Sequence, residues 1–135
     1  PAIDQAERQR TILVVDDDRD MVAGIVDLLE FNGYLADAAY SGSEAATAYR
    51  REPYDVVVMD IRMPNINGVE CQAMIQSMDP SAKIIMMTGH SKDRLLQQAD
   101  DQGALEILRK PFDFGGLLRQ LEKLTQKEIL PARGK

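Results

Sequence analysis

The sequence predicts a doubly wound α/β domain in which a parallel five-stranded sheet lies between two layers of helices. Five short apolar segments alternate along the chain with five segments of helical periodicity. The strongest of the apolar segments are runs of Val, Ile, Leu and Met, as in strands covered on both faces. Because consecutive strands are separated by helices, the crossovers are expected to be right-handed and the strands parallel.

One domain accounts for most of the 135 residues. We expect an N-terminal tail over 1–9, a domain over 10–127, and a C-terminal tail or linker over 128–135. The net charge of −6 argues against direct nucleic acid binding, which depends on clustered Lys and Arg. No apolar run reaches the ~18 residues that a membrane span needs, and the polar start is no signal peptide. The single cysteine, Cys71, excludes an internal disulfide, and we expect a cytoplasmic domain.

The elements of the first half follow from periodicity and from cap signals. Asp18 is a plausible N-cap and Gly33 a plausible stop for the first helix. Ser41 followed by Glu44 predicts a capping box at the start of the second helix. The predicted strands are 11–15, 34–39 and 55–60, and the predicted helices are 19–33, 41–51 and 69–78.

The second half repeats the pattern. We predict strands over 83–88 and 104–110, a helix over 91–102, and a final helix over 112–128. In a doubly wound sheet the functional site lies at the carboxyl ends of the strands. The polar residues that end the strands are therefore the candidates for a site.

Five side chains are expected to converge at that edge. Asp16 and Asp17 follow the first strand, Asp60 ends the third, Thr88 ends the fourth, and Lys110 ends the fifth. Taken singly, each has an ordinary reading as a cap, a turn residue or a solvated side chain. Together they form an oxygen-ligand set suited to Mg²⁺, with an ammonium that can neutralise phosphoryl oxygens. This set predicts phosphoryl transfer to an aspartate.

The sequence resembles the receiver domain of bacterial two-component response regulators. Four motifs in the expected order carry the resemblance: ILVVDDD, DVVVMDIRMPNINGVE, MMTGH and LRKPFD. It covers nearly the whole chain, from about residue 10 to 127. It implies a flavodoxin-like (βα)5 three-layer sandwich with strand order 2-1-3-4-5.

The resemblance also implies a mechanism. Asp60 would accept a phosphoryl group from a phosphohistidine of a sensor histidine kinase or a histidine phosphotransfer protein. Thr88 would hydrogen-bond that group and Lys110 would pair with it. The domain would be a switch and not an enzyme, catalysing only its own phosphorylation and dephosphorylation. Its output would pass to an output domain, or to a homodimer, through the face of helix 4, strand 5 and helix 5. The Mg²⁺ ligands would be Asp16, Asp17, Asp60 and the backbone carbonyl of Arg62.

Four further positions are expected to modulate the switch. Ile107 occupies the place where this family usually has Tyr or Phe, so aromatic coupling to the hydroxyl residue is not expected. Arg62 and His90 would flank the path of attacking water, and Arg62 is expected to shield or pair with the acyl phosphate. Pro111 is expected to follow a cis peptide bond, as the family implies.

Three other functions fit the sequence less well. Haloacid-dehalogenase-like phosphatases carry a second acid two residues after the nucleophile, where this chain has Arg62. A flavin or nucleotide binder would need a glycine-rich phosphate loop after the first strand, and neither GxGxxG nor GxxxxGK[ST] is present there. A degenerate receiver acting as a passive module would lack part of the acidic set or Lys110.

Overall fold

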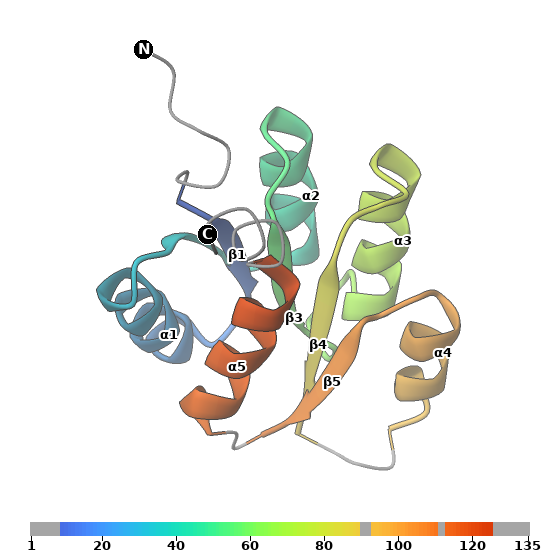
Figure 1. Cartoon of the computed structure of the whole chain (residues 1–135). Helices are drawn as coiled ribbons and strands as arrows, with labels where there is room; N and C mark the ends of the chain where they lie inside the picture. The colour runs from blue at the N-terminus through green and yellow to red at the C-terminus, as the bar shows by residue number, and fades with distance from the viewer. Residues whose placement is uncertain (1–8, 90–92, 111–112, 126–135) are drawn as a thin grey trace.

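The computed structural model describes residues 9–89, 93–110 and 113–125, which form one α/β sandwich (Figure 1). Its elements, in chain order, are β1 (Thr11–Val15), α1 (Arg19–Phe31), β2 (Leu35–Ala39), α2 (Gly42–Arg51), β3 (Val56–Asp60), α3 (Gly68–Met78), β4 (Ile84–Thr88), α4 (Leu95–Asp101), β5 (Glu106–Arg109) and α5 (Phe114–Thr125).

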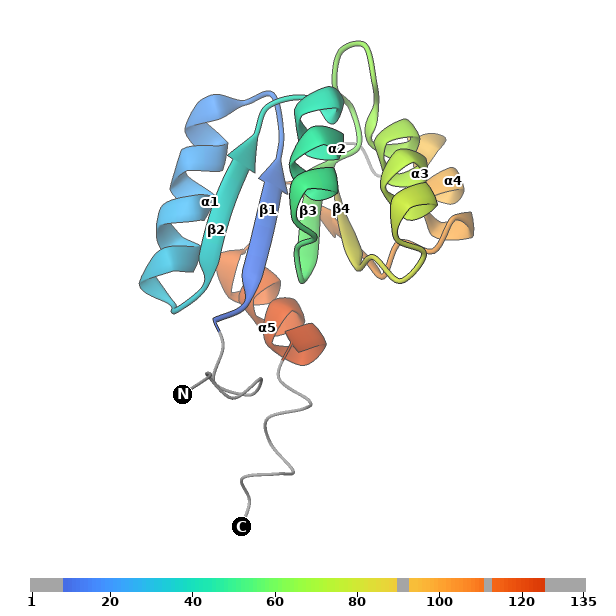
Figure 2. The ribbon, with the colours of Figure 1, turned by 90° about the horizontal axis from the view of Figure 1, so that it is seen from above.

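The strands form one parallel sheet in the order β2-β1-β3-β4-β5, which confirms the predicted architecture. Figure 2 shows the arrows of β1 and β2 side by side and pointing the same way. Because all strands run in parallel, their carboxyl ends meet at one edge, next to the point where the chain order reverses between β1 and β3.

Alternate residues of each strand pack against different helices, because successive side chains point to opposite faces of a sheet. One core lies between the sheet and α2, α3 and α4, and includes Leu13, Met59 and Ile75. The other lies between the sheet and α1 and α5, and includes Val14 and Leu117. Every residue of β3 and β4 is buried, which explains why these segments are the most apolar in the sequence.

The helix caps follow the predictions, with one difference. Asp18 caps α1 by accepting the N–H of Met21, and Gly33 has the positive φ (94°) of a helix stop. Ser41 accepts the N–H of Glu44 as predicted. The Glu44 carboxylate, however, accepts the N–H of Tyr40 and so does not close a box on Ser41.

A reciprocal capping box occurs instead at the start of α3. The Asn67 side chain accepts the N–H of Glu70, and the Glu70 side chain accepts the N–H of Asn67. This box starts α3, the helix that follows β3.

Two predicted helix starts were placed too early. Within the described residues α4 begins at Leu95, and Asp93 before it is not helical. The reason is that the Asp93 side chain bonds the N–H of Leu95 and the guanidinium of Arg62, which ends the preceding loop there. The last helix, α5, begins at Phe114, and its expected continuation beyond Thr125 lies outside the described residues. None of the helices in the described ranges is long and apolar enough to cross a membrane.

Candidate functional site

The five predicted site residues lie at adjacent strand ends. Asp16 and Asp17 directly follow β1, Asp60 is the last residue of β3, and Thr88 is the last residue of β4. Lys110 directly follows β5, and its N–H donates to the carbonyl of Thr88 at 2.6 Å. The register of the sheet places these strand ends beside one another, as the sequence predicted.

The centre of the site is an acidic cluster. Asp16, Asp17 and Asp60 each bring a carboxylate oxygen within 4.8 Å of the others. The side chains of Asp16 and Asp60 are only 2% and 8% exposed, whereas Asp17 is exposed. The cluster therefore has two buried members and one member facing solvent, so it is open to solvent on the Asp17 side.

Lys110 links the two buried carboxylates. Its Nζ donates to Oδ2 of Asp16 at 2.8 Å and lies 2.9 Å from Oδ1 of Asp60. The lysine side chain is 24% exposed, so its ammonium reaches inward from the rim. The contact with Asp16 joins residues 94 positions apart, and the two contacts together hold the end of β5 against the ends of β1 and β3.

Burial raises the pKa of both Asp16 and Asp60, and Lys110 opposes that rise in each case. The charge of Asp16 raises the pKa of Asp60 further. Burial works against the charged form of Lys110, but hydrogen bonds to the two carboxylates prevail and leave the lysine pKa raised. The lysine therefore stays protonated, and the pocket holds more negative charge than it can neutralise.

A glycine brings the start of α3 against the end of β3. A Cβ on Gly68 would lie 2.5 Å from the Asp60 carbonyl oxygen and 2.8 Å from the Ile61 Cα. The Gly68 N–H donates to the Ile61 carbonyl at 2.9 Å. Only glycine permits this approach without moving the backbone of Asp60. The sequence indicated a turn at Gly68 but gave no sign of this contact.

Arg62 lies two residues beyond Asp60, with a side chain that is 64% exposed. Its Nε and Nη2 donate to the two carboxylate oxygens of Asp93 at 2.6 and 2.8 Å. The sequence predicted that Arg62 lies near Asp60 but not that it pairs with Asp93, since 31 residues separate Arg62 and Asp93. No local sequence signal joins them.

Of the three remaining positions expected to modulate the switch, the structure describes Ile107 only. Ile107 is half-buried in β5 and packs on the core that α2, α3 and α4 cover, where it is a strand residue without an aromatic ring. His90 and Pro111 lie outside the described residues, so the expectations for them stay predictions.

The kinds of atom that the cluster presents limit which ligands the site can bind. The three clustered side chains present carboxylate oxygen only, and such oxygens suit a hard divalent cation. Two of these carboxylates are buried beside one ammonium, an arrangement that favours a further cation over an apolar ligand. The residues present could therefore hold a metal ion, and the buried Asp60 is available as an oxygen nucleophile.

Comparisons with known proteins agree with this site. The family model described as the response regulator receiver domain matches residues 12–122. The chain is 32% identical to the chemotaxis protein CheY of Thermotoga maritima, over 87% of this chain and 98% of that protein. It is 38% identical to the transcriptional regulatory protein ZraR of Salmonella typhimurium over 83% of this chain, and it spans only a quarter (25%) of ZraR.

A solved structure shares the fold. The response regulator TrrA of Thermotoga maritima, determined in complex with Mg²⁺ and BeF, superposes with a TM-score of 0.78. It is 34% identical, over 86% of this chain and 99% of that one. The chain belongs to the response regulator receiver domain family, and it is a signalling switch of the CheY type.

Proposed function

We propose that Asp60 is the residue that is phosphorylated. The observation that carries the proposal is the bridge of Lys110 between Asp16 and Asp60, inside a cluster of three carboxylates. A lysine held this close to the Asp60 carboxylate lies where the oxygens of a transferred phosphoryl group would arrive. Thr88, buried at the end of the neighbouring strand, supplies a hydroxyl at the same edge.

The reaction needs few protein groups. An Oδ of Asp60 attacks phosphorus and forms an O–P bond, while the P–N bond to the donor's imidazole breaks. The imidazole nitrogen keeps the electron pair of that bond and takes a proton from solvent. Lys110 then exchanges its contact with the Asp60 carboxylate for a contact with the phosphoryl oxygens. Hydrolysis of the same acyl phosphate by water returns Asp60 to its starting state.

We assign the metal site to the same cluster. Asp16, Asp17, Asp60 and the backbone carbonyl of Arg62 would hold Mg²⁺, which takes oxygen ligands and keeps several waters. When bound, Mg²⁺ neutralises charge on the phosphoryl oxygens during transfer. The burial of both the Asp16 and Asp60 carboxylates beside the Lys110 ammonium supports a cation here, because two buried negative charges are not balanced by one positive charge.

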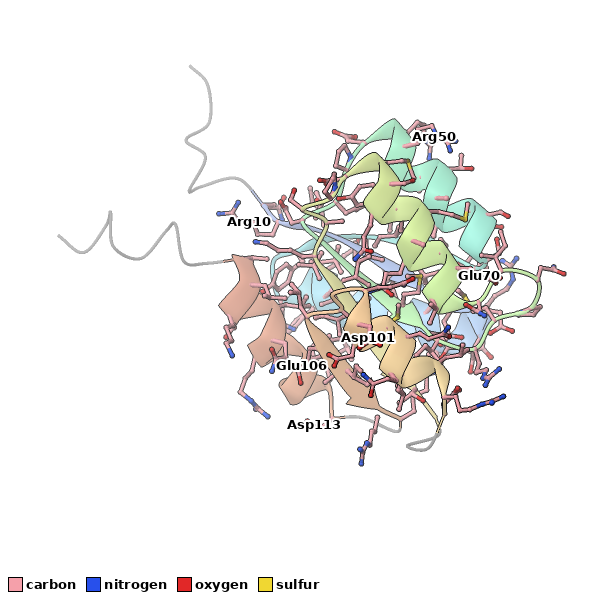
Figure 3. All side chains as sticks on the ribbon, turned by 90° about the vertical axis from the view of Figure 1, so that its right-hand side faces the viewer. Arg10, Arg50, Glu70, Asp101, Glu106 and Asp113 are labelled. Carbon is pink, nitrogen blue, oxygen red and sulfur yellow. The ribbon has the colours of Figure 1, made fainter. Side chains whose placement is uncertain are left out.

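Phosphorylation would be read on the surface of α4, β5 and α5. Thr88 would turn toward the phosphoryl group and shift an equilibrium between two conformations. Asp101 of α4 and Glu106 of β5 mark that surface in Figure 3. Since Ile107 replaces the usual aromatic residue, the shift would pass through packing of Ile107 against the core that α2, α3 and α4 cover and not through an inward-moving ring.

The partners follow from this chemistry. The donor would be the phosphohistidine of a sensor histidine kinase or a histidine phosphotransfer protein, in the cytoplasm. The receiver unit would be residues 10–127, and its output would be a further domain, as the length of ZraR suggests, or a homodimer. The domain would catalyse only its own phosphorylation and dephosphorylation.

Intact mass after treatment with acetyl phosphate and Mg²⁺ tests the proposal. We expect the wild type to gain one phosphoryl group, about 80 Da. The gain should be absent in Asp60→Asn and abolished by EDTA. A folded, Mg²⁺-binding wild type that gains no mass would contradict the proposal and leave the domain as a passive interaction module.

A further inference from the structure

The contact between Arg62 and Asp93 has a consequence for the phosphoacceptor site. Arg62 follows Asp60 by two residues, and its guanidinium is occupied in a two-pronged bond to Asp93 at 2.6 and 2.8 Å. The geometry points to Asp93 as a positioning residue that holds Arg62 away from Asp60 in the unphosphorylated protein. We propose that Arg62 exchanges Asp93 for the phosphoryl group when Asp60 is phosphorylated. This inference rests on the proposed phosphorylation of Asp60.

The two acceptors are chemically alike, so they compete. A guanidinium fork matches the oxygens of a carboxylate or a phosphoryl group equally well in shape. A phosphoryl group carries up to two negative charges against one for a carboxylate. Because Arg62 lies two residues from Asp60 and its side chain is largely exposed, the guanidinium would turn without disturbing the core once its bond to Asp93 breaks.

Asp93 keeps a role after Arg62 leaves. Its carboxylate also accepts the N–H of Leu95, the first residue of α4, at 2.9 Å. Its side chain is only 2% exposed, so it is buried beside the first turn of α4. The contact between Arg62 and Asp93 therefore connects the loop after β3 directly to the start of α4. Release of Arg62 would loosen that start.

The other end of α4 is fixed to α3. Gln72 of α3 donates to the Ala99 carbonyl, and Gln102 after α4 donates to both the Gln72 side chain and the Val69 carbonyl. Gln76 donates to the Gln102 carbonyl. These amide bonds contain no ionised group that a phosphoryl group would attract. Exchange at Arg62 would therefore move the first turn of α4 about a fixed last turn.

The proposal is tested by measuring how tightly the protein binds a mimic of the phosphoryl group. While Asp93 holds Arg62, Arg62 is not available to the mimic, and the apparent affinity of the protein for the mimic is lower. The probe is beryllium fluoride with Mg²⁺, and its bound fraction is measured by fluorine NMR. Asp93→Asn, which removes the charge and keeps the size, should bind at an about fivefold lower midpoint concentration than wild type. In an Arg62→Gln background, Asp93→Asn should produce no change. Such dependence on Arg62 would not arise if Asp93 only supported the fold.

The chain offers a matched control. Asp113 also pairs with an arginine, Arg119, and also accepts an N–H at a helix start, that of Gly115 (Asp113 is labelled in Figure 3). Asp113→Asn should leave the midpoint unchanged. In the wild type, the NMR signal of the Arg62 Nε–H should shift when the mimic binds, which tests the exchange without any mutation.

The outcomes separate the two proposals. A wild type that neither binds the mimic nor gains a phosphoryl group would overturn the function assigned to Asp60, and this inference with it. The inference alone would be overturned if the wild type binds the mimic and Asp93→Asn leaves the midpoint concentration unchanged. It would also be overturned if Asp93→Asn changes the midpoint equally in the wild-type and Arg62→Gln backgrounds. An Arg62 Nε–H signal that does not move on binding would also overturn it.

Discussion

At the scale of single residues, Lys110 supplies the positive charge that partly neutralises the carboxylates of the pocket. Its ammonium contacts two carboxylates that are almost fully buried. In metal-free protein at neutral pH, Lys110→Met should lower the free energy of unfolding by about 2 kcal/mol, because buried charges lose their partner. Urea denaturation measures the change. Lys123→Met, at an exposed position of α5, should stay within about 0.5 kcal/mol of wild type. Equal effects of the two substitutions would contradict the assigned role.

Gly68 sets how closely α3 approaches the backbone of Asp60. Gly68→Ala would push a methyl group into the backbone of Asp60 and Ile61, so we expect a loss of about 1–3 kcal/mol in stability. The same measurement on Gly24→Ala provides the control, because a Cβ there meets nothing within 4 Å. That change lies inside α1 and should stabilise by about 0.5–1 kcal/mol. If Gly68→Ala proved as stable as wild type, the close approach would be wrong.

Between elements, a hydrogen bond joins α2 to the end of α3. The Tyr49 hydroxyl donates to Asp79 at 2.6 Å, and this bond, with those from Ser81, lowers the pKa of Asp79 from 3.8. A carboxylate with a lowered folded-state pKa stabilises the fold above about pH 3.8, and its contribution fades as pH falls through the folded value. Tyr49→Phe should therefore cost about 1 kcal/mol at pH 6, and less at pH 3.

Thermal or urea unfolding of Tyr49→Phe and wild type, measured side by side at both pH values, checks that dependence. A stability difference that stays constant between pH 6 and pH 3 would show that Asp79 is not the partner of the hydroxyl. A difference that grows as the pH falls would contradict the sign of the shift.

Most elements could be predicted because their signals are local. The β-branched run of β1 and the Asp18 cap of α1 lie within a few residues of the structure that they specify. The start of α4 could not be predicted in the same way. It depends on Asp93, whose side chain is held by Arg62 from a loop 31 residues earlier. The reciprocal box at Asn67 was missed because the preceding Pro64 and Asn65 suggested only a turn.

The site could be predicted as a set of residues but not as a set of contacts. Parallel strands bring Asp16, Asp60 and Thr88 to one edge whatever the details of packing. The topology did not reveal that Lys110 would bridge Asp16 as well as Asp60. It also did not reveal the partner of Arg62. Both contacts depend on the orientation of a long side chain, that of Lys110 or Arg62, and strand order does not determine that orientation.

For the whole molecule, the acidic pocket predicts stabilisation by metal. A cation that binds only the folded state raises stability with its concentration, by about 2.7 kcal/mol at a hundredfold excess over Kd. Wild type should therefore melt at a higher temperature in millimolar Mg²⁺ than in EDTA, while Asp16→Asn should show a smaller increase. Scanning calorimetry measures both. Identical melting temperatures with and without Mg²⁺ in the wild type would argue against a metal in this cluster.

The central claim is that the phosphoryl group resides on Asp60, and the most direct test is to locate it. Borohydride reduces an aspartyl phosphate to homoserine, which peptide mass spectrometry then places in the sequence. After treatment with acetyl phosphate and Mg²⁺, we predict homoserine at position 60. Homoserine at position 16 or 17 instead, or none in a protein that has gained a phosphoryl group, would contradict the account.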